Sequence, residues 1–247
     1  MTWLRSALFN LLFYVGSAAI AVAALALLPG PRRWMLRLMR LWALFVLALL
    51  RGVCGIGLRV TGAEHLPADG AALVAAKHQS AFDTVVWFAL LPDTAYVLKR
   101  ELLHLPVYGW LARKAGMIAV DREAGPSAMR HLIRAGRAAA AEGRQVVIFP
   151  EGTRVAPGAR APYQPGIAAL AAATGLPVIP AATDSGLSWG RRSFRKRPGL
   201  ITLAVLPPLP PGLRREDLMR RLEEAIEAET ARLCAAAAAR PVDEAVD

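Results

Sequence analysis

Two short clusters contain residues whose types and spacing suit chemistry. His78 and Asp83 stand with four residues between them, directly after the apolar run 71–76, and Glu151–Arg154 follows the apolar run 146–149. A carboxylate that bonds one imidazole nitrogen fixes the tautomer and favours proton uptake at the other nitrogen. A glycine close to an arginine suits an anion such as phosphate. Together the clusters predict a transfer reaction on a phosphate-bearing hydroxyl compound.

The residues around His78 also allow a different chemistry. Ser80 could complete a Ser-His-Asp hydrolase, and the sequence leaves this alternative open. It is disfavoured because Ser80 lies outside a Gly-x-Ser-x-Gly elbow and only Gln79 separates it from His78. We expect Gln79 and Ser80 to shape the turn through local hydrogen bonds. The other histidines lack a carboxylate at comparable spacing and are interpreted as structural or exposed residues: His65, His104 and His131.

The second cluster offers three kinds of contact to an anion. Gly152 permits close backbone approach, Thr153 supplies a hydroxyl, and Arg154 supplies a guanidinium suited to bidentate phosphate binding. Taken alone, the cluster would be interpreted as a helix cap with a surface salt bridge. Arg122 adds a second guanidinium after another predicted strand. Two arginines and an anion-binding turn near one histidine are more than a cap requires.

Short apolar segments alternate with helical stretches beyond residue 57. Several segments are rich in Val, Ile and Leu without polar alternation, as expected for strands covered on both faces. This alternation predicts an α/β domain with a mostly parallel or mixed sheet flanked by helices. The predicted strands are 58–61, 71–76, 95–98, 117–120, 146–149, 178–182 and 201–206.

The candidate site residues follow four of these predicted strands. His78 follows the second strand, Lys99 the third, Arg122 the fourth and Glu151–Arg154 the fifth. In α/β sheets, ligands bind outside the carboxyl ends of the strands. The clusters therefore converge on one rim if these strands are parallel, whereas antiparallel strands would scatter them.

Three helices are expected in this domain. One begins near Pro126 and ends before Gly143, with proline at its start and glycine past its end. A second spans about 165–174, and a charged third helix spans about 214–238. The two later helices would cover the sheet together with the first.

The first 50 residues are apolar enough to contact a membrane. Residues 6–28 carry no formal charge and would form a helix about 34 Å long, enough to cross the hydrocarbon layer or dip into it. In residues 34–50, arginines and aromatic side chains fall on different sides of a second helix, as in interfacial helices. A cleaved signal peptide is the alternative, disfavoured by the length of the run and by the second helix. The predicted parts are a membrane-associated two-helix segment (1–50), an α/β domain (51–240) and a flexible tail (241–247).

Composition supports membrane contact and an anionic partner. The apolar fraction is 55%, and 30 Lys and Arg against 19 Asp and Glu give a formal charge of +11. Such a charge favours anionic lipid, phosphorylated substrates or nucleic acid, and the apolar N-terminus favours lipid among these. Cys54 and Cys234 form no CxxC motif, which disfavours both a disulfide framework and a metal site.

In this order the motifs resemble the family of glycerophosphate and lysophospholipid acyltransferases, with the strongest likeness to its bacterial 1-acylglycerol-3-phosphate members. The likeness spans about residues 57–206 and includes the stretch 99–110 between the first two blocks. Two positions depart from it, because many members carry asparagine at Lys77 and serine at Val155. The matching blocks are His78–Asp83, Gly116–Arg122, Phe149–Arg154 and Val178–Ala181.

The resemblance implies roles for the clustered residues. His78 would deprotonate the free hydroxyl of the acceptor, Asp83 would orient His78, and the alkoxide would attack an acyl thioester directly. The co-substrate would be acyl-CoA or an acyl carrier protein thioester, with no other cofactor and no metal. The residues implied to hold the glycerophosphate are Lys99, Arg122, Glu151, Gly152, Thr153 and Arg154.

The expected reaction is acylation of the sn-2 hydroxyl of lysophosphatidate to give phosphatidate in phospholipid biosynthesis. The expected place is the cell (inner) membrane, with the active site facing the cytoplasm and membrane lipids as partners. Another lysolipid acceptor, such as a lyso-ornithine lipid, is the alternative that Lys77 leaves open. A basic membrane-anchored binding module is the non-enzymatic alternative. Nucleic acid is not expected as a partner, because no basic motif interleaved with aromatic residues supports it.

Overall fold

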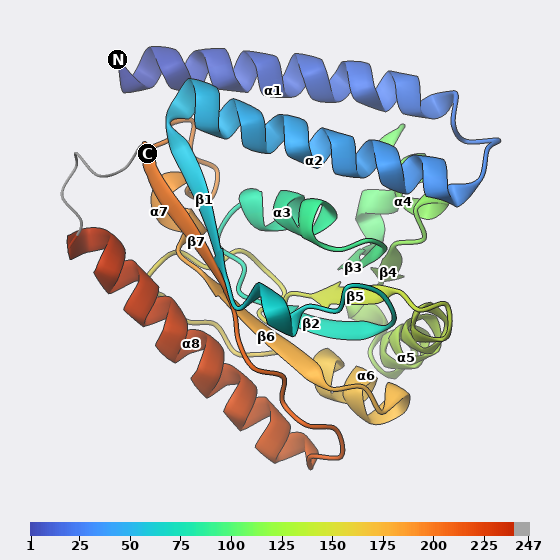
Figure 1. Cartoon of the computed structure of the whole chain (residues 1–247). Coiled ribbons are helices and arrows are strands. Elements are labelled where there is room, and N and C mark those ends of the chain that lie inside the picture. The colour runs from blue at the N-terminus through green and yellow to red at the C-terminus, as the bar shows by residue number, and fades with distance from the viewer. Residues whose placement is uncertain (240–247) are drawn as a thin grey trace.

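The protein folds around a seven-stranded sheet covered by helices on both faces (Figure 1). The structure is a computed structural model, and it describes residues 1–239. Each predicted strand is present, with its ends shifted by at most a few residues. The strands are β1 (Ile56–Thr61), β2 (Ala72–Ala76), β3 (Thr94–Lys99), β4 (Ile118–Val120), β5 (Gln145–Ile148), β6 (Val178–Thr183) and β7 (Gly199–Val205).

The strand order across the sheet is β1-β7-β6-β2-β5-β3-β4. Strands β2, β3, β4, β5 and β6 pair in parallel, while β7 pairs antiparallel with β6 and parallel with β1. The predicted mostly parallel or mixed α/β sheet is therefore confirmed. The carboxyl ends of the five parallel strands meet at one rim, which is the condition for the polar clusters to converge.

Helices form a layer on each face of the sheet. In Figure 1, α1 and α2 lie above the sheet with α3, whereas α8 lies below it with α5 and α6 toward the lower right. The three helices expected in the domain correspond to α5, α6 and α8. The α-helices are α1 (Thr2–Leu25), α2 (Arg32–Cys54), α3 (Phe82–Leu90), α4 (Tyr108–Lys114), α5 (Pro126–Ala141), α6 (Gly166–Thr174), α7 (Ser185–Ser188) and α8 (Arg215–Ala239).

The sheet buries both of its faces, because successive residues of a strand point to opposite sides. In β2, Val74 packs in the core that holds Trp87 of α3. Its neighbour Leu73 packs in the opposite core with Leu132 of α5 and Leu222 of α8. This burial explains why the strand sequences are continuously apolar and do not alternate between apolar and polar residues.

The N-terminal helices pack against the α/β body. Phe9 of α1 and Val46 and Leu50 of α2 belong to the same core cluster as Trp87. Helix α2 ends at Cys54, four residues beyond the predicted segment, and Gly55 with φ 65° provides its left-handed cap. The division of the chain at residue 50 stays a prediction, and the shared core shows that the two parts pack as one body.

Helix α1 is, within residues 1–239, the one helix whose length and composition would allow it to cross a membrane. Its partner α2 holds it through a hydrogen bond of 2.9 Å from Trp42 Nε1 to Ser17 Oγ. Much of the outer surface of both helices is apolar and exposed, which indicates association with a membrane. The exposed large side chains include Trp3, Leu4, Leu8, Leu11, Tyr14, Val15, Val22, Trp34, Leu41 and Leu44.

Candidate active site

The catalytic candidates His78 and Asp83 face each other at the carboxyl end of β2. His78 Nδ1 lies 3.1 Å from Asp83 Oδ2. The loop after β2 carries the histidine, and the first turn of α3 carries the aspartate, so the four intervening residues close one turn between them. This pairing leaves the other ring nitrogen, Nε2, as the one that can accept a proton from a substrate.

The Asp83 carboxylate is buried and fully engaged. Its Oδ2 also accepts the backbone N–H groups of Gln79 and Ser80, each at 2.7 Å, and its Oδ1 accepts the hydroxyl of Ser185 at 2.6 Å. A buried carboxylate needs such bonds to offset the loss of water. They also hold its oxygens at fixed positions relative to His78.

Ser80 takes part in the turn rather than in a nucleophilic triad. Its hydroxyl oxygen accepts the backbone N–H of Phe82 at 3.1 Å, and its own N–H binds Asp83. The Gln79 side chain accepts the N–H of Gly186 at 3.0 Å. The local hydrogen bonds expected of Gln79 and Ser80 are therefore confirmed, and the Gln79 side chain also reaches a distant loop.

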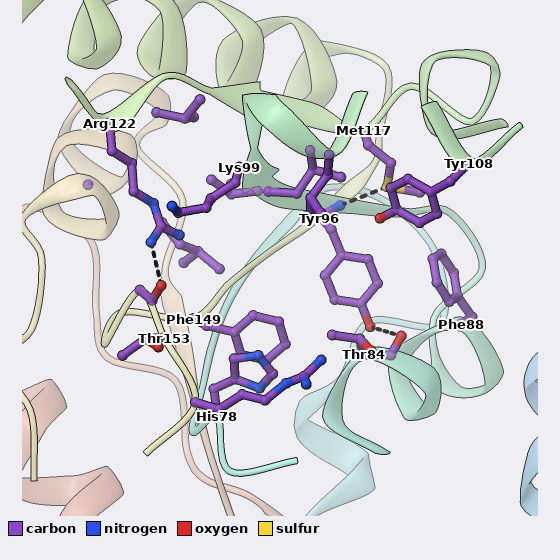
Figure 2. A pocket seen from close by; sticks show the side chains of 18 of the residues that line it. His78, Thr84, Phe88, Tyr96, Lys99, Tyr108, Met117, Arg122, Phe149 and Thr153 are labelled. Carbon is purple, nitrogen blue, oxygen red and sulfur yellow. Dashed lines mark hydrogen bonds between the residues drawn. The ribbon is translucent and has the colours of Figure 1, made fainter. Parts of the chain in front are cut away.

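Aromatic packing fixes the plane of the His78 ring. The ring stacks on Phe149, with centroids 4.1 Å apart and an interplanar angle of 17°, and Phe149 stacks in turn on Tyr96 (Figure 2). The Tyr96 hydroxyl donates to the carbonyl of Thr84 at 2.9 Å, so the buried tyrosine is anchored at its far end. Burial raises the pKa of Tyr96 well above its ordinary value, which keeps its hydroxyl protonated.

A buried ion cluster supports the catalytic loop from behind. Lys77 is 1% exposed, and its Nζ lies 2.7 Å from Glu151 Oε1 and 2.6 Å from Glu227 Oε1 of α8. Glu151 Oε2 accepts the backbone N–H of His78 at 2.9 Å. Burial raises the pKa of the Glu151 carboxyl even though Lys77 lies beside it. We call Lys77, Glu151 and Glu227 the Lys77 triad.

This placement changes the interpretation of Glu151. The sequence groups it with the glycerophosphate ligands, but its carboxylate oxygens face Lys77 and the His78 backbone. An ionised carboxylate would also repel a phosphate. We therefore interpret Glu151 as a residue that positions His78 rather than as a phosphate ligand.

The other predicted ligands gather around the turn after β5. A guanidinium nitrogen of Arg122 donates to the Gly152 carbonyl, which ties the end of β4 to this turn (Figure 2). Gly152 has φ 67°, and a Cβ there would lie 3.2 Å from Arg122, so both its backbone and its neighbour favour glycine. Thr153 follows at the surface and Arg154 is half-buried. Lys99 lies near Arg122 at the end of β3 (Figure 2).

A single cavity of about 1190 Å³ connects these residues. Its polar wall includes His78, Lys99, Arg122 and Arg154. The remaining wall is largely apolar and extends between the N-terminal helices and the α/β body. The apolar lining there includes Ile20, Met35, Trp42, Phe88, Leu111 and Met117. The cavity thus joins a base and cations to a space suited to hydrocarbon.

The structure brings together every predicted site residue at this rim and adds three to which the sequence reasoning gave no role. Ser185 follows β6, which neighbours β2, so its position after a strand of the same rim was the available signal. Phe149 directly follows β5 and stacks on His78. Glu227 lies 150 residues from Lys77 in sequence, and no local pattern connects the two.

Cys54 and Cys234 are free thiols. Within residues 1–239, no group of three or more His, Cys, Asp and Glu side chains is arranged to hold a metal ion.

The α/β sheet with a His-Asp pair at its rim defines the class of protein. Residues 57–184 match the Acyltransferase family, and the chain belongs to this family. It is thus an acyltransferase, as the resemblance of its motifs predicts.

Comparison with individual proteins shows which acyltransferases the chain resembles. The chain is 34% identical over 211 residues to the 1-acyl-sn-glycerol-3-phosphate acyltransferase of Pseudomonas aeruginosa, covering 83% of this chain and 80% of that protein. It is 31% identical to the 1-acyl-sn-glycerol-3-phosphate acyltransferase of Limnanthes douglasii, covering 79% of this chain and 69% of that protein. The crystal structure of the 1-acyl-sn-glycerophosphate (LPA) acyltransferase from Thermotoga maritima superposes with a TM-score of 0.79 at 23% identity, over 98% of this chain and 99% of that one. That structural match shows a shared fold.

Proposed function

We propose that this protein transfers a fatty acyl group from a thioester to the sn-2 hydroxyl of lysophosphatidate, giving phosphatidate. The observation that carries the proposal is the pairing of His78 Nδ1 with Asp83 at 3.1 Å, beside a cavity that is cationic at one end and apolar elsewhere. The names of the relatives from Pseudomonas aeruginosa and Limnanthes douglasii support the same acceptor.

In the proposed reaction, His78 acts as a general base. Nε2 takes the proton from the acceptor hydroxyl as its oxygen attacks the thioester carbonyl carbon, and Asp83 stabilises the resulting imidazolium. The tetrahedral intermediate then collapses, the C–S bond breaks, and the thiolate leaves with the proton from His78. The chain's own residues supply base and orientation, and the thioester is the co-substrate, either acyl-CoA or an acyl carrier protein.

The acceptor phosphate is assigned to the cations beside the base. In lysophosphatidate the carbon that carries the reacting hydroxyl is bonded directly to the carbon that carries the phosphate, so the phosphate must bind close to His78. Arg122 is bonded to the turn that continues from Glu151, whose carboxylate binds the His78 backbone. Arg122 and Arg154, with Lys99 near them, meet this requirement, and guanidinium groups bind phosphate through paired hydrogen bonds.

The membrane side of the proposal rests on the apolar outer surface of α1 and α2. Acceptor and donor chains are hydrocarbon, and the cavity reaches the inner side of the same helices, through residues such as Ile20 and Met35. We propose that the protein lies on the inner membrane with its site toward the cytoplasm, where the thioester donors are made. The hydrocarbon chains then need not leave an apolar environment to reach His78.

Acyl transfer to a panel of lysolipids tests this function. Purified protein in detergent is given a radiolabelled acyl thioester and either lysophosphatidate, a lyso-ornithine lipid or a lysophosphatidylcholine, and the products are separated by chromatography. The proposal expects labelled phosphatidate as the main product. Efficient labelling of the ornithine lipid with no labelled phosphatidate would show that the acceptor is the lyso-ornithine lipid rather than lysophosphatidate. The proposed roles of His78 and Asp83 would not be affected by that result.

A further inference from the structure

The exposed apolar side chains gather on one part of the protein. Within residues 1–239, the exposed large hydrophobic side chains lie in residues 1–44, at Phe194, which stacks on Trp3 of α1, and on a short segment around the start of α4. Helices α5, α6 and α8, on the opposite face of the sheet, carry none of them. We call residues 102–110 the α4 segment, and its exposed apolar side chains are Leu102, Leu105, Tyr108 and Trp110.

The α4 segment adjoins the two N-terminal helices. It runs from the 3₁₀ helix η2 (Arg100–His104) into α4, which lies on the same face of the sheet as α1 and α2 (Figure 1). Leu111 of α4 packs in the same small core as Ala24 of α1 and Met35 of α2. The segment therefore extends the apolar surface that the proposed function assigns to the membrane. A contiguous exposed apolar surface of this kind marks a site of interaction.

The composition of the segment fits a bilayer that contains anionic lipid. The stretch 99–114 holds four basic residues, Lys99, Arg100, Arg113 and Lys114, against the single acidic residue Glu101. Basic side chains beside an apolar surface are attracted to anionic headgroups. Tryptophan and tyrosine are enriched where the hydrocarbon of a bilayer meets its headgroups, and the segment exposes one of each.

A strained turn fixes the backbone of the segment. Val107 has φ 63°, which is rare for a β-branched residue. The N–H of Gly109 donates to the Leu105 carbonyl at 2.9 Å, and a Cβ at Gly109 would lie 2.0 Å from the carbonyl oxygen of Leu103. Strain persists where the surrounding structure imposes it, and it gathers at functional sites. This tight turn holds Leu105 and Trp110 at the surface, where they are 50% and 52% exposed.

The segment also forms one wall of the cavity that contains His78. Leu102 and Tyr108 line the cavity from this side, and Ile20 of α1 and Trp42 of α2 line it from the other (Figure 2 shows Tyr108). If both walls contact the bilayer, a lysolipid in the leaflet can move its chain into the cavity without exposing hydrocarbon to water.

We infer that the α4 segment is a second membrane-contacting surface, which inserts Leu105 and Trp110 into the same leaflet as α1 and α2, so that the lysolipid enters the cavity between the segment and these helices. The inference deepens the proposed function and rests on it. The occupant of this surface is a bilayer containing anionic lipid, because the apolar surface is continuous with that of α1 and α2 and is flanked by basic residues.

Fluorescence quenching by lipids tests the contact. Single cysteines are introduced by Leu105→Cys or Trp110→Cys, each together with Cys234→Ala, and are labelled with an environment-sensitive fluorophore. Leu41→Cys on α2 is the positive control, and Ala228→Cys, exposed on α8 on the opposite face of the sheet, is the negative control. The labelled proteins are bound to vesicles of phosphatidylcholine and phosphatidylglycerol that carry a nitroxide on the acyl chain.

Cys54 is buried, and labelling of the Cys234→Ala parent gives its background. The labels at positions 105 and 110 should be quenched about as strongly as the label at 41, and the label at 228 should not be quenched. Quenching at 41 without quenching at 105 and 110 would overturn the inference and leave membrane attachment through α2 intact. Labels at 105 and 110 that respond to an acyl carrier protein or to protein concentration, but not to lipid, would assign the surface to the carrier or to a second copy of this chain and would also overturn it.

Kinetics in two formats test the role in lipid entry. Burial of the exposed half of a leucine side chain changes an equilibrium constant about fourfold to tenfold, and a carboxylate in its place also repels anionic lipid. For Leu105→Glu, kcat/KM on lysophosphatidate in vesicles should therefore fall about tenfold. On detergent-dispersed lysophosphatidate it should stay near wild type, because Leu105 does not line the cavity. Ala228→Glu, which adds the same charge on α8, should leave both values unchanged.

Trp110→Gln is the second variant, because it removes an exposed apolar side chain without adding a charge. Activity in detergent and thermal melts report whether each variant is folded. Equal losses in vesicles and in detergent for both variants, or no loss in vesicles, would overturn the inference. The quenching test requires no acyl transfer, and the kinetic test can use whichever lysolipid the wild type acylates, so a wrong acceptor in the proposed function is distinguished from a wrong membrane contact.

Discussion

Removal of the Lys77 ammonium should destabilise the protein strongly, because it would leave two buried carboxylates without a counterion. The side chains of Glu151 and Glu227 are 0% and 8% exposed, and Lys77 Nζ lies within 2.7 Å of both. Loss of one partner from a buried ion pair costs about 3–5 kcal/mol. For a chain of this size, about 2–4 °C of melting temperature is lost per kcal/mol, so Lys77→Met should melt about 6–20 °C lower than the wild type.

Glu227→Gln is the matched control for this variant. The triad holds two carboxylates for one ammonium, so this substitution leaves Lys77 and Glu151 as a balanced pair. The amide oxygen of glutamine can still accept the Tyr163 hydroxyl, which lies 2.9 Å from Glu227 Oε1. The control should therefore lose much less stability than Lys77→Met, on the order of 1 kcal/mol.

The pH dependence of Lys77→Met distinguishes the charge effect from loss of packing. Burial already raises the pKa of Glu151, with Lys77 opposing the rise, so removal of Lys77 should raise this pKa further. A carboxyl with a raised pKa binds more protons when folded, so stability falls as pH rises through the window above its ordinary value of 4.5.

Thermal melts of Lys77→Met and wild type in detergent at several pH values between 5 and 8 measure this effect. The deficit of the variant should shrink toward pH 5. A melting temperature within about 2 °C of the wild type, or a deficit that does not change with pH, would refute the role assigned to the Lys77 triad.

Three further outcomes are expected. Replacing either Arg122 or Arg154 with lysine keeps the positive charge but loses the paired N–H groups of the guanidinium. Steady-state kinetics should therefore show a raised KM for lysophosphatidate and little change in KM for the acyl thioester. Equal changes in both KM values would contradict the assignment of these arginines to the phosphate. Deleting residues 1–50 should lower the melting temperature and promote aggregation, because α1 and α2 share a core with the sheet. If light scattering showed instead that the truncated protein is a stable monomer, the α/β domain would fold alone. Asp93→Asn should cost about 1.5–3 kcal/mol at pH 7 and flatten the loss of stability in acid. Burial alone would raise the pKa of the Asp93 carboxyl, but hydrogen bonds from Arg32 and Arg144 lower this pKa below 3.8. The stabilisation by Asp93 is therefore complete above that pH and is lost below it. Urea melts in which Asp93→Asn loses stability in acid as steeply as the wild type would contradict this.

Local sequence patterns predicted the elements of the fold and the chemistry of the central pair. Strands such as β2 read as apolar runs because both faces are buried, and the spacing of His78 and Asp83 closes a single turn whatever the rest of the chain does. The convergence of the clusters depended on parallel pairing, which follows from contacts between strands far apart in sequence. For the same reason the antiparallel insertion of β7 between β1 and β6 was not predicted.

The supporting residues of the site escaped prediction because their partners are distant in sequence. Ser185 reaches Asp83 across 102 residues, and Glu227 reaches Lys77 across 150. A lysine directly after an apolar strand must either leave the core or find a carboxylate, so Lys77 was a signal that a partner exists. No local pattern could show that the partner lies on α8. The predicted flexible tail, 241–247, lies outside the described residues.

Acyl transfer by His78→Ala tests the central claim most directly. The variant, the wild type and Asp83→Asn are purified in detergent, and turnover is measured with saturating thioester and lysophosphatidate, alongside thermal melts and CoA titration. A positioned general base contributes about 10²–10⁴ in rate, so kcat of His78→Ala should fall at least a hundredfold while melting temperature and CoA affinity stay near wild type. Asp83→Asn should also lose most of its turnover, because the carboxylate that orients the ring is gone. Substantial turnover by a folded His78→Ala would contradict the assignment of His78 as the catalytic base.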